Sequence, residues 1–253
     1  MSNTTDGRTG QRLAALLMLA GLAGCATLSH DAEPPAAGKA PVSVATEAGA
    51  IAWEHRSFPG KLPTRFTPQL QDGRQVIEAK ADSSASMLRR TVRIEPQELG
   101  PLRFSWRVPA LIETADMGRR DADDSPVRIV LAFEGDRSRF SARDAMLSEL
   151  ARTLTGEEMP YATLMYVWCN QRPIGTVIAS PRTDRIRKLV VESGPQRLDH
   201  WLAYERDVRA DFERAFGEPP GALVGVALMT DTDNTRSVAR AWYGPVQLSS
   251  FAR

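Results

Sequence analysis

Short apolar runs separated by turn residues dominate the chain after residue 50. Two of them, residues 87–95 and 102–108, alternate apolar with polar positions, as half-buried strands do. Others are almost continuously apolar, which is typical of strands buried on both faces. The runs that we interpret as strands are 75–80, 87–95, 102–108, 127–133, 162–169, 176–179, 186–192, 221–230 and 238–248.

Two stretches show helical spacing instead, Ala142–Leu154 and Asp199–Phe216. Gly156 ends the first and Gly217 the second, in the position where a left-handed residue commonly closes a helix. The apolar positions that recur at this spacing are Met146, Leu147, Leu150 and Leu154 in the first stretch and Trp201, Val208, Phe212 and Phe216 in the second.

Many short strands and only two helices predict a mostly β protein. Because no regular alternation of strands with helices appears, a doubly wound parallel sheet is disfavoured. Turn signals at short intervals favour an antiparallel β-sandwich or barrel with two accessory helices. This folded domain is predicted over residues 51–253, and it contains no internal repeat.

Residues 1–24 have the pattern of a lipoprotein signal peptide. Arg8 and Arg12 precede the apolar run Leu13–Leu22, which is too short to span a bilayer as a helix. The run ends in a Leu-Ala-Gly-Cys motif at Cys25, which resembles the bacterial lipobox, where the cysteine thiol takes a diacylglycerol. A buried helix that happens to end in Gly-Cys is the alternative reading.

A lipidated Cys25 predicts an address in the cell envelope. Several acyl chains on one residue give stable anchoring in a lipid bilayer. Because Ala26 follows the cysteine in place of aspartate, the expected location is the periplasmic face of the outer membrane. Residues 25–50, rich in Ala, Pro and Gly, are predicted to form a flexible tether.

The overall charge argues against nucleic acid as a partner. The chain has 32 basic and 31 acidic residues and a net charge of +1, whereas nucleic-acid binding usually needs a basic face. Only two cysteines occur, Cys25 and Cys169, so lipidation of the first leaves no pair for a disulfide. Cys169 itself lies in an apolar run and is expected to be an inert buried thiol.

A strand-end loop supplies the first candidate site. Asp231, Asp233 and Asn234 follow the apolar run 221–230 and place oxygen atoms at nearby positions. Two carboxylates in an Asp-x-Asp loop could bind Ca²⁺ at Asp231 and Asp233, although calcium takes six to eight oxygens and no further acidic ligands follow. The alternative is a loop whose side chains bond backbone amides.

Two further sets of charged residues are candidates for ligand binding. Asp124 precedes a buried strand that carries Arg128, and the two could face one site together. Glu205 and Arg206 lie in the second predicted helix, where an ion-pair cluster is the alternative to a ligand site. Aromatic side chains could provide a stacking surface for sugars or could simply fill the core; they are Trp168, Trp201, Trp242 and Tyr243.

Several of these stretches together resemble a bacterial family known as domain of unknown function 3047, over roughly residues 53–251. The stretches are Asp123-Asp124 before Arg128, Tyr166-Val167-Trp168, Trp201 with Glu205-Arg206 and Asp211, Phe216-Gly217, and Asp231–Thr235 before Tyr243-Gly244. Two departures are Cys169 and Arg236, the latter where we expect the family loop to carry glycine. The resemblance implies a jelly-roll sandwich like that of carbohydrate-binding modules, and no established activity.

These observations leave three functional hypotheses. The first is a membrane-anchored, non-enzymatic module that binds a saccharide or envelope polymer through Asp124, Arg128, Trp168, Glu205, Arg206, Asp231, Asp233 and Asn234. The second is a glycan hydrolase that uses two of Asp124, Glu205, Asp231 and Asp233 as acid and base. The third is a structural protein that docks a partner. Carboxylates locked against arginines would favour the first over the second.

Overall fold

Strands that bury apolar side chains in a shared core make up most of the fold. Along the chain they are β1 (Glu54–Ser57), β2 (Arg65–Gln71), β3 (Arg74–Asp82), β4 (Ala85–Ile94), β5 (Leu99–Arg107), β6 (Ser125–Phe133), β7 (Ala162–Cys169), β8 (Val177–Ala179), β9 (Ile186–Ser193), β10 (Leu202–Arg206), β11 (Leu223–Asp231), β12 (Val238–Tyr243) and β13 (Gln247–Ser250). The helices are α1 (Ala142–Thr155) and α2 (Val208–Phe216), with short 3₁₀ turns at Pro96–Glu98 and Arg137–Arg139.

The computed structural model describes residues 52–250. The predicted signal peptide (1–24), the predicted lipidation site Cys25 and the predicted tether (25–50) lie outside these residues.

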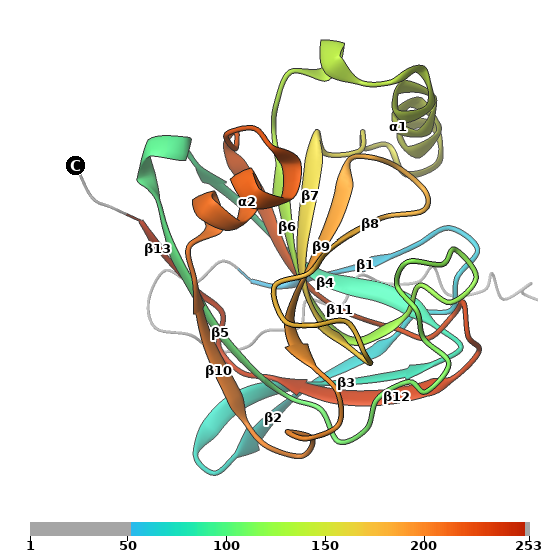
Figure 1. The fold of residues 1–253 in the computed structure, drawn as a ribbon. Helices are drawn as coiled ribbons and strands as arrows, with labels where there is room; N and C mark the ends of the chain where they lie inside the picture. The colour runs from blue at the N-terminus through green and yellow to red at the C-terminus, as the bar shows by residue number, and fades with distance from the viewer. Residues whose placement is uncertain (1–51, 251–253) are drawn as a thin grey trace, which may run out of the picture. The chain divides into compact units, whose positions relative to one another are not determined.

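The strands form two curled sheets that pack into a sandwich (Figure 1). One sheet has seven strands in the order β1-β4-β11-β6-β7-β9-β8. The other has the order β10-β5-β12-β3-β2, with β13 beside β5. All strand pairs in these sheets are antiparallel except β7–β9, which is parallel. The predicted mostly β sandwich with two accessory helices is therefore confirmed.

The core lies between the two sheets. Strand β5 contributes Phe104 and Trp106 from one sheet, and β6 contributes Ile129 and Leu131 from the other, all buried. Tyr243 of β12 also joins the two sheets by hydrogen bonds: its hydroxyl donates to the carbonyl of Met229 (2.6 Å) and accepts from the backbone N–H of Arg128 (3.2 Å). Burial of these aromatic and aliphatic side chains fixes which face of each strand points outward.

Each strand predicted from hydrophobic patterning is present, with bounds shifted by a few residues. The predicted run 238–248 is two strands, β12 and β13, which are separated by residues 244–246. Three strands were not predicted: β1, β2 and β10. The first two are edge strands with many exposed polar positions, so they carry a weak hydrophobic signal.

The predicted helix over residues 199–216 is wrong in its first half. Leu202–Arg206 is strand β10, which pairs antiparallel with β5, and the helix α2 begins only at Val208. Asp207 is the helix cap, because its side chain accepts a hydrogen bond from the N–H of Ala210 (3.0 Å). The spacing of Tyr204 and Val208 suits a helix, but Leu202 and Tyr204 also alternate as in a strand.

Helix α1 is present as predicted, but its apolar stripe faces solvent. Met146, Leu150 and Leu154 are 65%, 50% and 59% exposed. The buried side chains of the helix are instead Asp144 and Ser148, which are held by hydrogen bonds to Thr183 and Arg137. Within residues 52–250, no helix has the length and hydrophobicity needed to cross a membrane.

Candidate functional site

The strongest polar cluster lies on the outer face of the seven-stranded sheet, where β6 begins and β11 ends. Arg128 stands opposite Met229 in the β6–β11 ladder, and Asp231 stands opposite Ser125. The guanidinium of Arg128 binds the carboxylate of Asp231 in a fork, with Nε–Oδ1 at 2.8 Å and Nη2–Oδ2 at 3.0 Å. Both side chains are at most 4% exposed, so this is a buried bidentate ion pair.

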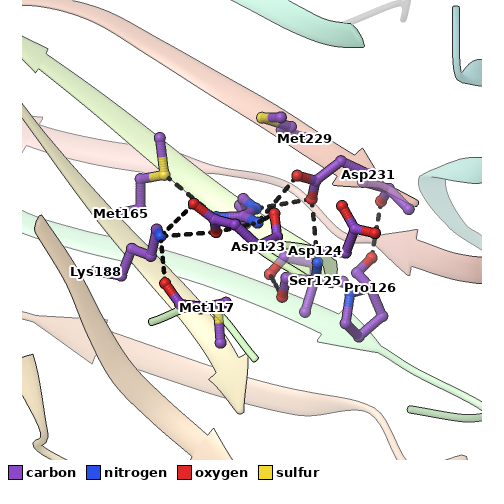
Figure 2. A network of polar contacts seen from close by, with 12 residues as sticks. Met117, Asp123, Asp124, Ser125, Pro126, Met165, Lys188, Met229 and Asp231 are labelled. Carbon is purple, nitrogen blue, oxygen red and sulfur yellow. Dashed lines mark hydrogen bonds and ion pairs between the residues drawn. The ribbon is translucent and has the colours of Figure 1, made fainter. Parts of the chain in front are cut away.

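Asp123 and Lys188 extend the pair into a four-charge network (Figure 2). Nη2 of Arg128 donates to the backbone carbonyl (2.8 Å) and the carboxylate (3.2 Å) of Asp123. The ammonium of Lys188 lies 2.7 Å from the same carboxylate and donates to the carbonyl of Met117 at 2.8 Å. Two cations thus balance two carboxylates, and every member is buried. We call Asp123, Arg128, Lys188 and Asp231 the buried network.

Asp124 is not part of the buried network; its side chain holds the loop after β11. Its Oδ1 accepts from the side-chain amide of Asn234 at 2.8 Å. Its Oδ2 accepts from the backbone N–H (2.7 Å) and the hydroxyl (2.6 Å) of Thr235. Asp124 is 1% exposed. These contacts hold the loop in place from a distant segment of the chain.

Burial sets the electrostatics of the network. It raises the pKa of Asp231 to about 6, against the opposing effect of the Arg128 charge. It also lowers the pKa of Lys188 to about 8. Burial by itself lowers the pKa of Arg128, but the charges of Asp231 and Asp123 outweigh it and raise that pKa above its ordinary value. The network is therefore held by mutual neutralisation inside a poorly solvated site.

Three carboxylates, those of Asp124, Asp231 and Asp233, each offer an oxygen atom within 4.8 Å of the others. Their existing partners leave little for a cation: Arg128 binds both oxygens of Asp231, and Lys61 forms an ion pair with Asp233. A divalent ion here would also meet the guanidinium charge at close range. The calcium prediction at Asp231 and Asp233 stays a prediction, without support from the donor set.

The other predicted ligand-binding residues do not join this cluster. Glu205 points outward from β10 and forms a fork with Arg103 (3.0 and 3.1 Å) on the six-stranded sheet. Arg206 binds Asp211 of α2 at 2.8 and 2.5 Å. The expectation that Glu205 and Arg206 share a site with Asp231 is wrong, because they belong to a strand of the other sheet.

Two of the candidate aromatic residues, Trp168 and Trp242, offer no open stacking surface. Trp168 is 1% exposed, and its indole N–H donates to the carbonyl of Gly194 (3.0 Å). Trp242 faces outward from β12, but the guanidinium carbons of Arg107 and Arg240 lie 4.8 and 4.5 Å from its ring centroid, and it is only 6% exposed. Trp168 is therefore a core residue, and the prediction that it binds a ligand has no support.

Two features of the cluster were missed. Lys188 directly precedes the apolar residues Leu189–Val191 of β9, and a lysine beside such a run is a signal for a buried partner. Asp123 is the second, because the sequence does not reveal that only β7 separates β6 from β9 in the sheet and therefore gives no sign of the partner Lys188.

An open groove lies further along the same outer face, over β4, β11 and β6. It has a volume of about 820 Å³. Thr91, Gly225 and Ala132 line it from three neighbouring strands at one level, since Gly225 is paired with both of the others. Small side chains at these positions leave the surface of the sheet accessible. We call this the outer groove.

Charged side chains surround the outer groove. Arg89 and Arg93 come from β4, Glu134 follows β6, and Glu157 follows α1. Arg89 grips Glu157 with Nη1–Oε2 at 2.5 Å and Nη2–Oε1 at 3.0 Å, and Arg93 binds Glu134 at 2.9 Å. Hydrogen bonding to Arg89 lowers the pKa of Glu157, although burial opposes it. The rim thus offers paired donors and acceptors to a ligand.

Comparison with known proteins places the fold but not an activity. A family model described as "Protein of unknown function (DUF3047)" matches residues 51–247. No curated protein matches the chain.

Solved structures with a similar arrangement include an endo-1,4-beta-glucanase CelB2 (10% identity, 85% of this chain and 98% of that chain, TM-score 0.46). They also include endoglucanase 3 of Trichoderma harzianum, from family GH12 (8% identity, 85% and 96%, TM-score 0.44), and a CBM4 structure (9% identity, 84% and 95%, TM-score 0.36). At these values the likeness concerns the general two-sheet arrangement alone.

Proposed function

Since this chain belongs to the family described as a protein of unknown function (DUF3047), we propose that it is a non-catalytic saccharide-binding module of the cell envelope. The binding site in this proposal is the outer groove. Residues 1–24 would deliver the chain across the inner membrane, and acylated Cys25 would hold it at the periplasmic face of the outer membrane. Residues 25–50 would then separate the sandwich from the lipid surface.

The outer groove is the observation that carries this proposal. Its volume of about 820 Å³ lies within the range of small-molecule sites. Arg89, Arg93, Glu134 and Glu157 provide donors and acceptors around its edge. Sugars carry hydroxyl groups that donate and accept at once, so they suit a site of this mixed kind better than an apolar ligand does.

Among the described residues, the carboxylates support binding over hydrolysis. A glycosidase needs one carboxyl that keeps its proton near neutral pH and a second carboxylate 5 to 10 Å away, roughly, in an open cleft. Glu157 and Glu134 are paired with arginines, and Glu205 is held by Arg103. Asp231 has a raised pKa but is 4% exposed and bound by Arg128, so substrate does not reach it. Binding without chemistry is thus the function that this geometry favours.

A glycan and cell-wall-fragment binding screen on the full-length chain, with and without Ca²⁺, tests the proposal. Thr91→Trp places an indole in the groove at an exposed position of β4. Thr67→Trp is the matched control, because Thr67 is an exposed position of β2 on the other sheet. We expect Thr91→Trp to abolish binding and Thr67→Trp to keep it.

Other outcomes separate the alternatives. Loss of binding in Thr67→Trp alone would move the site to the six-stranded sheet, near Trp242. No glycan binding by the wild type would end the proposal and favour the docking role. Release of reducing ends from a bound glycan would favour the hydrolase. Metabolic labelling with a radioactive fatty acid, compared between wild type and Cys25→Ala, tests the anchor separately.

A further inference from the structure

Glu157 occupies the position of a ligand in the outer groove. It does not belong to the sheet but to the segment that follows α1, directly after Gly156, the left-handed residue that ends the helix (φ 76°). From there its carboxylate reaches the outer face of β4, where Arg89 binds both of its oxygens. Arg56 of the neighbouring strand β1 donates to the same carboxylate at 2.6 Å. One carboxylate thus receives three hydrogen bonds from two guanidinium groups.

The sheet supplies the cations of this site and one flanking carboxylate, that of Glu54, which lies 3.2 Å from Nε of Arg56 and 3.9 Å from Nη2 of Arg89. The α1–β7 connection supplies the carboxylate that accepts hydrogen bonds from both guanidinium groups. Arg56, Arg89 and Arg93 lie on β1 and β4, while Glu157 comes from the connection. The Nε–H of Arg89 is buried and has no hydrogen-bond partner within residues 52–250, whereas Nε of Arg56 lies 3.2 Å from the carboxylate of Glu54 on β1. Two arginines converging on one planar carboxylate form a receptor for a carboxylate, whichever molecule carries it.

This pair is open to exchange. The side chain of Glu157 is 47% exposed, and those of Arg89 and Arg56 are 23% and 29% exposed. Because solvent reaches the Glu157 carboxylate, another carboxylate can approach the two guanidinium groups before Glu157 leaves them. Neither guanidinium then loses its charge partner during the replacement. Arg89 and Glu157 both line the groove, so a molecule lying on Thr91 and Gly225 can extend a carboxylate to Arg89.

We propose that the ligand of the outer groove is an acidic saccharide, and that Glu157 holds the arginines until the carboxylate of a uronic acid replaces it. The inference rests on the proposed saccharide-binding function and adds the charge of the ligand to it. Binding is then an exchange: the ligand carboxylate takes Arg89 and Arg56, and Glu157 turns to solvent. No bond is made or broken, and net charge in the clamp is unchanged.

The substitution Glu157→Gln tests this exchange on the full-length chain. It removes the negative charge of Glu157, leaves that of Glu54, and keeps the size of the side chain, so we expect affinity for oligogalacturonate to rise about tenfold. The methyl ester of the same oligosaccharide, which lacks the charge, should bind more weakly to the wild type and should not gain from the substitution. Arg89→Gln should remove the preference for the acid. Glu149→Gln is the matched control, because Glu149 is an exposed glutamate of α1 paired with Arg152 and does not line the groove.

A second probe needs no polymer. D-glucuronate and glucose titrated against the ¹⁵N-labelled chain report on the arginine Nε–H signals, and only glucuronate should shift those of Arg56 and Arg89.

Equal binding of the acid and its ester would overturn the inference while leaving saccharide binding intact. Weaker acid binding in Glu157→Gln would overturn it too. If the affinity of a phosphorylated sugar rises more on Glu157→Gln substitution than that of the uronic acid, then Arg56 and Arg89 select phosphate, and the choice of carboxylate is wrong. If no saccharide binds either the wild type or Glu157→Gln, both proposals are wrong.

Discussion

Two arginine–carboxylate forks lie on the same outer face of one sheet and differ in what covers them. Arg128 and Ala132 are four residues apart on β6, so the buried network and the outer groove are separated by only about 13 Å along the strand. At the first end the pair Arg128–Asp231 is 3% and 4% exposed, beneath the segment that carries Met117. At the other end the pair Arg89–Glu157 is 23% and 47% exposed.

This difference decides what each fork can do. A buried ion pair keeps its geometry because either partner alone would be an uncompensated charge in a poorly solvated interior. An exposed pair contributes little to stability, so its anion can be replaced. Similar contact distances therefore suit a structural role at the covered end and the proposed binding role at the open end.

Removal of one partner from the buried fork is the most severe test of this contrast. Asp231→Ala leaves Arg128 with only Asp123, which already neutralises Lys188. We expect a loss of about 3–5 kcal/mol in the free energy of unfolding, measured by urea denaturation. Glu157→Ala is the matched change at the exposed fork and should cost less than about 1 kcal/mol.

A double variant distinguishes charge from packing. Arg128→Met with Asp231→Leu removes one cation and one anion together and leaves Asp123 with Lys188. We expect it to recover most of the stability that Asp231→Ala loses, because apolar side chains of similar volume often replace a buried pair without cost. If the double variant is as unstable as the single one, the neutralisation argument is wrong.

The pH dependence of stability sharpens the contrast further. Burial raises the pKa of Asp231 from 3.8 to about 6 in the folded protein. A carboxyl with a raised pKa contributes stability below its unfolded value, and this contribution is lost as pH rises through the folded value. Between pH 4 and 7 the wild type should therefore lose up to about 3 kcal/mol relative to Asp231→Asn.

Unfolding of both proteins in urea at several pH values measures this difference, and carbon-13 NMR of the aspartate carboxyls gives the pKa directly. Glu157 shifts the other way, since hydrogen bonding to Arg89 lowers its pKa. A titration of Asp231 below pH 4 would mean that the Arg128 charge outweighs burial, and that the two forks differ less than their exposure suggests.

The loop after β11 separates two acidic residues that look equivalent in sequence. Asp231 is bound by Arg128, whereas Asp233 pairs with Lys61, whose side chain is 44% exposed. We expect Asp233→Ala to lower the free energy of unfolding by less than about 1 kcal/mol, far less than Asp231→Ala. Melting with and without a chelator measures both variants. A large chelator-dependent loss in Asp233→Ala would instead revive the calcium prediction at this loop.

Much of the fold could be predicted because a strand with one buried face carries apolar residues at every second position of the sequence. Strands β4 and β5 show this alternation clearly, and Gly156 marks the end of α1 correctly. The prediction is wrong for the stretch before Asp207 because two patterns overlap there. Residues 201–216 have helical spacing, but Leu202–Arg206 also alternates as a strand does. Only the pairing with β5, which the sequence does not show, selects the strand.

The sites were less accessible from sequence because they depend on contacts between distant strands. The structure brings Asp124, Arg128, Asp231 and Asn234 close together, although the sequence offers them as two separate sets, one at a strand start and one in a strand-end loop. The outer groove left no local pattern. It requires the neighbourhood of β4, β11 and β6, together with a glutamate from the α1–β7 connection.

Arg236 offers the smallest and last test, on the loop that Asp124 clamps. It adopts a left-handed backbone with φ 54°, a conformation that glycine accepts more readily than arginine, and glycine is the residue expected here from the family resemblance. We expect Arg236→Gly to raise the free energy of unfolding by up to about 1 kcal/mol, measured in urea. Ser237→Gly is the control, since Ser237 has no positive φ and glycine there should destabilise. The strain persists because Asp124 binds Asn234 and Thr235 firmly at the covered end. Destabilisation by Arg236→Gly would mean that the arginine side chain supports the loop.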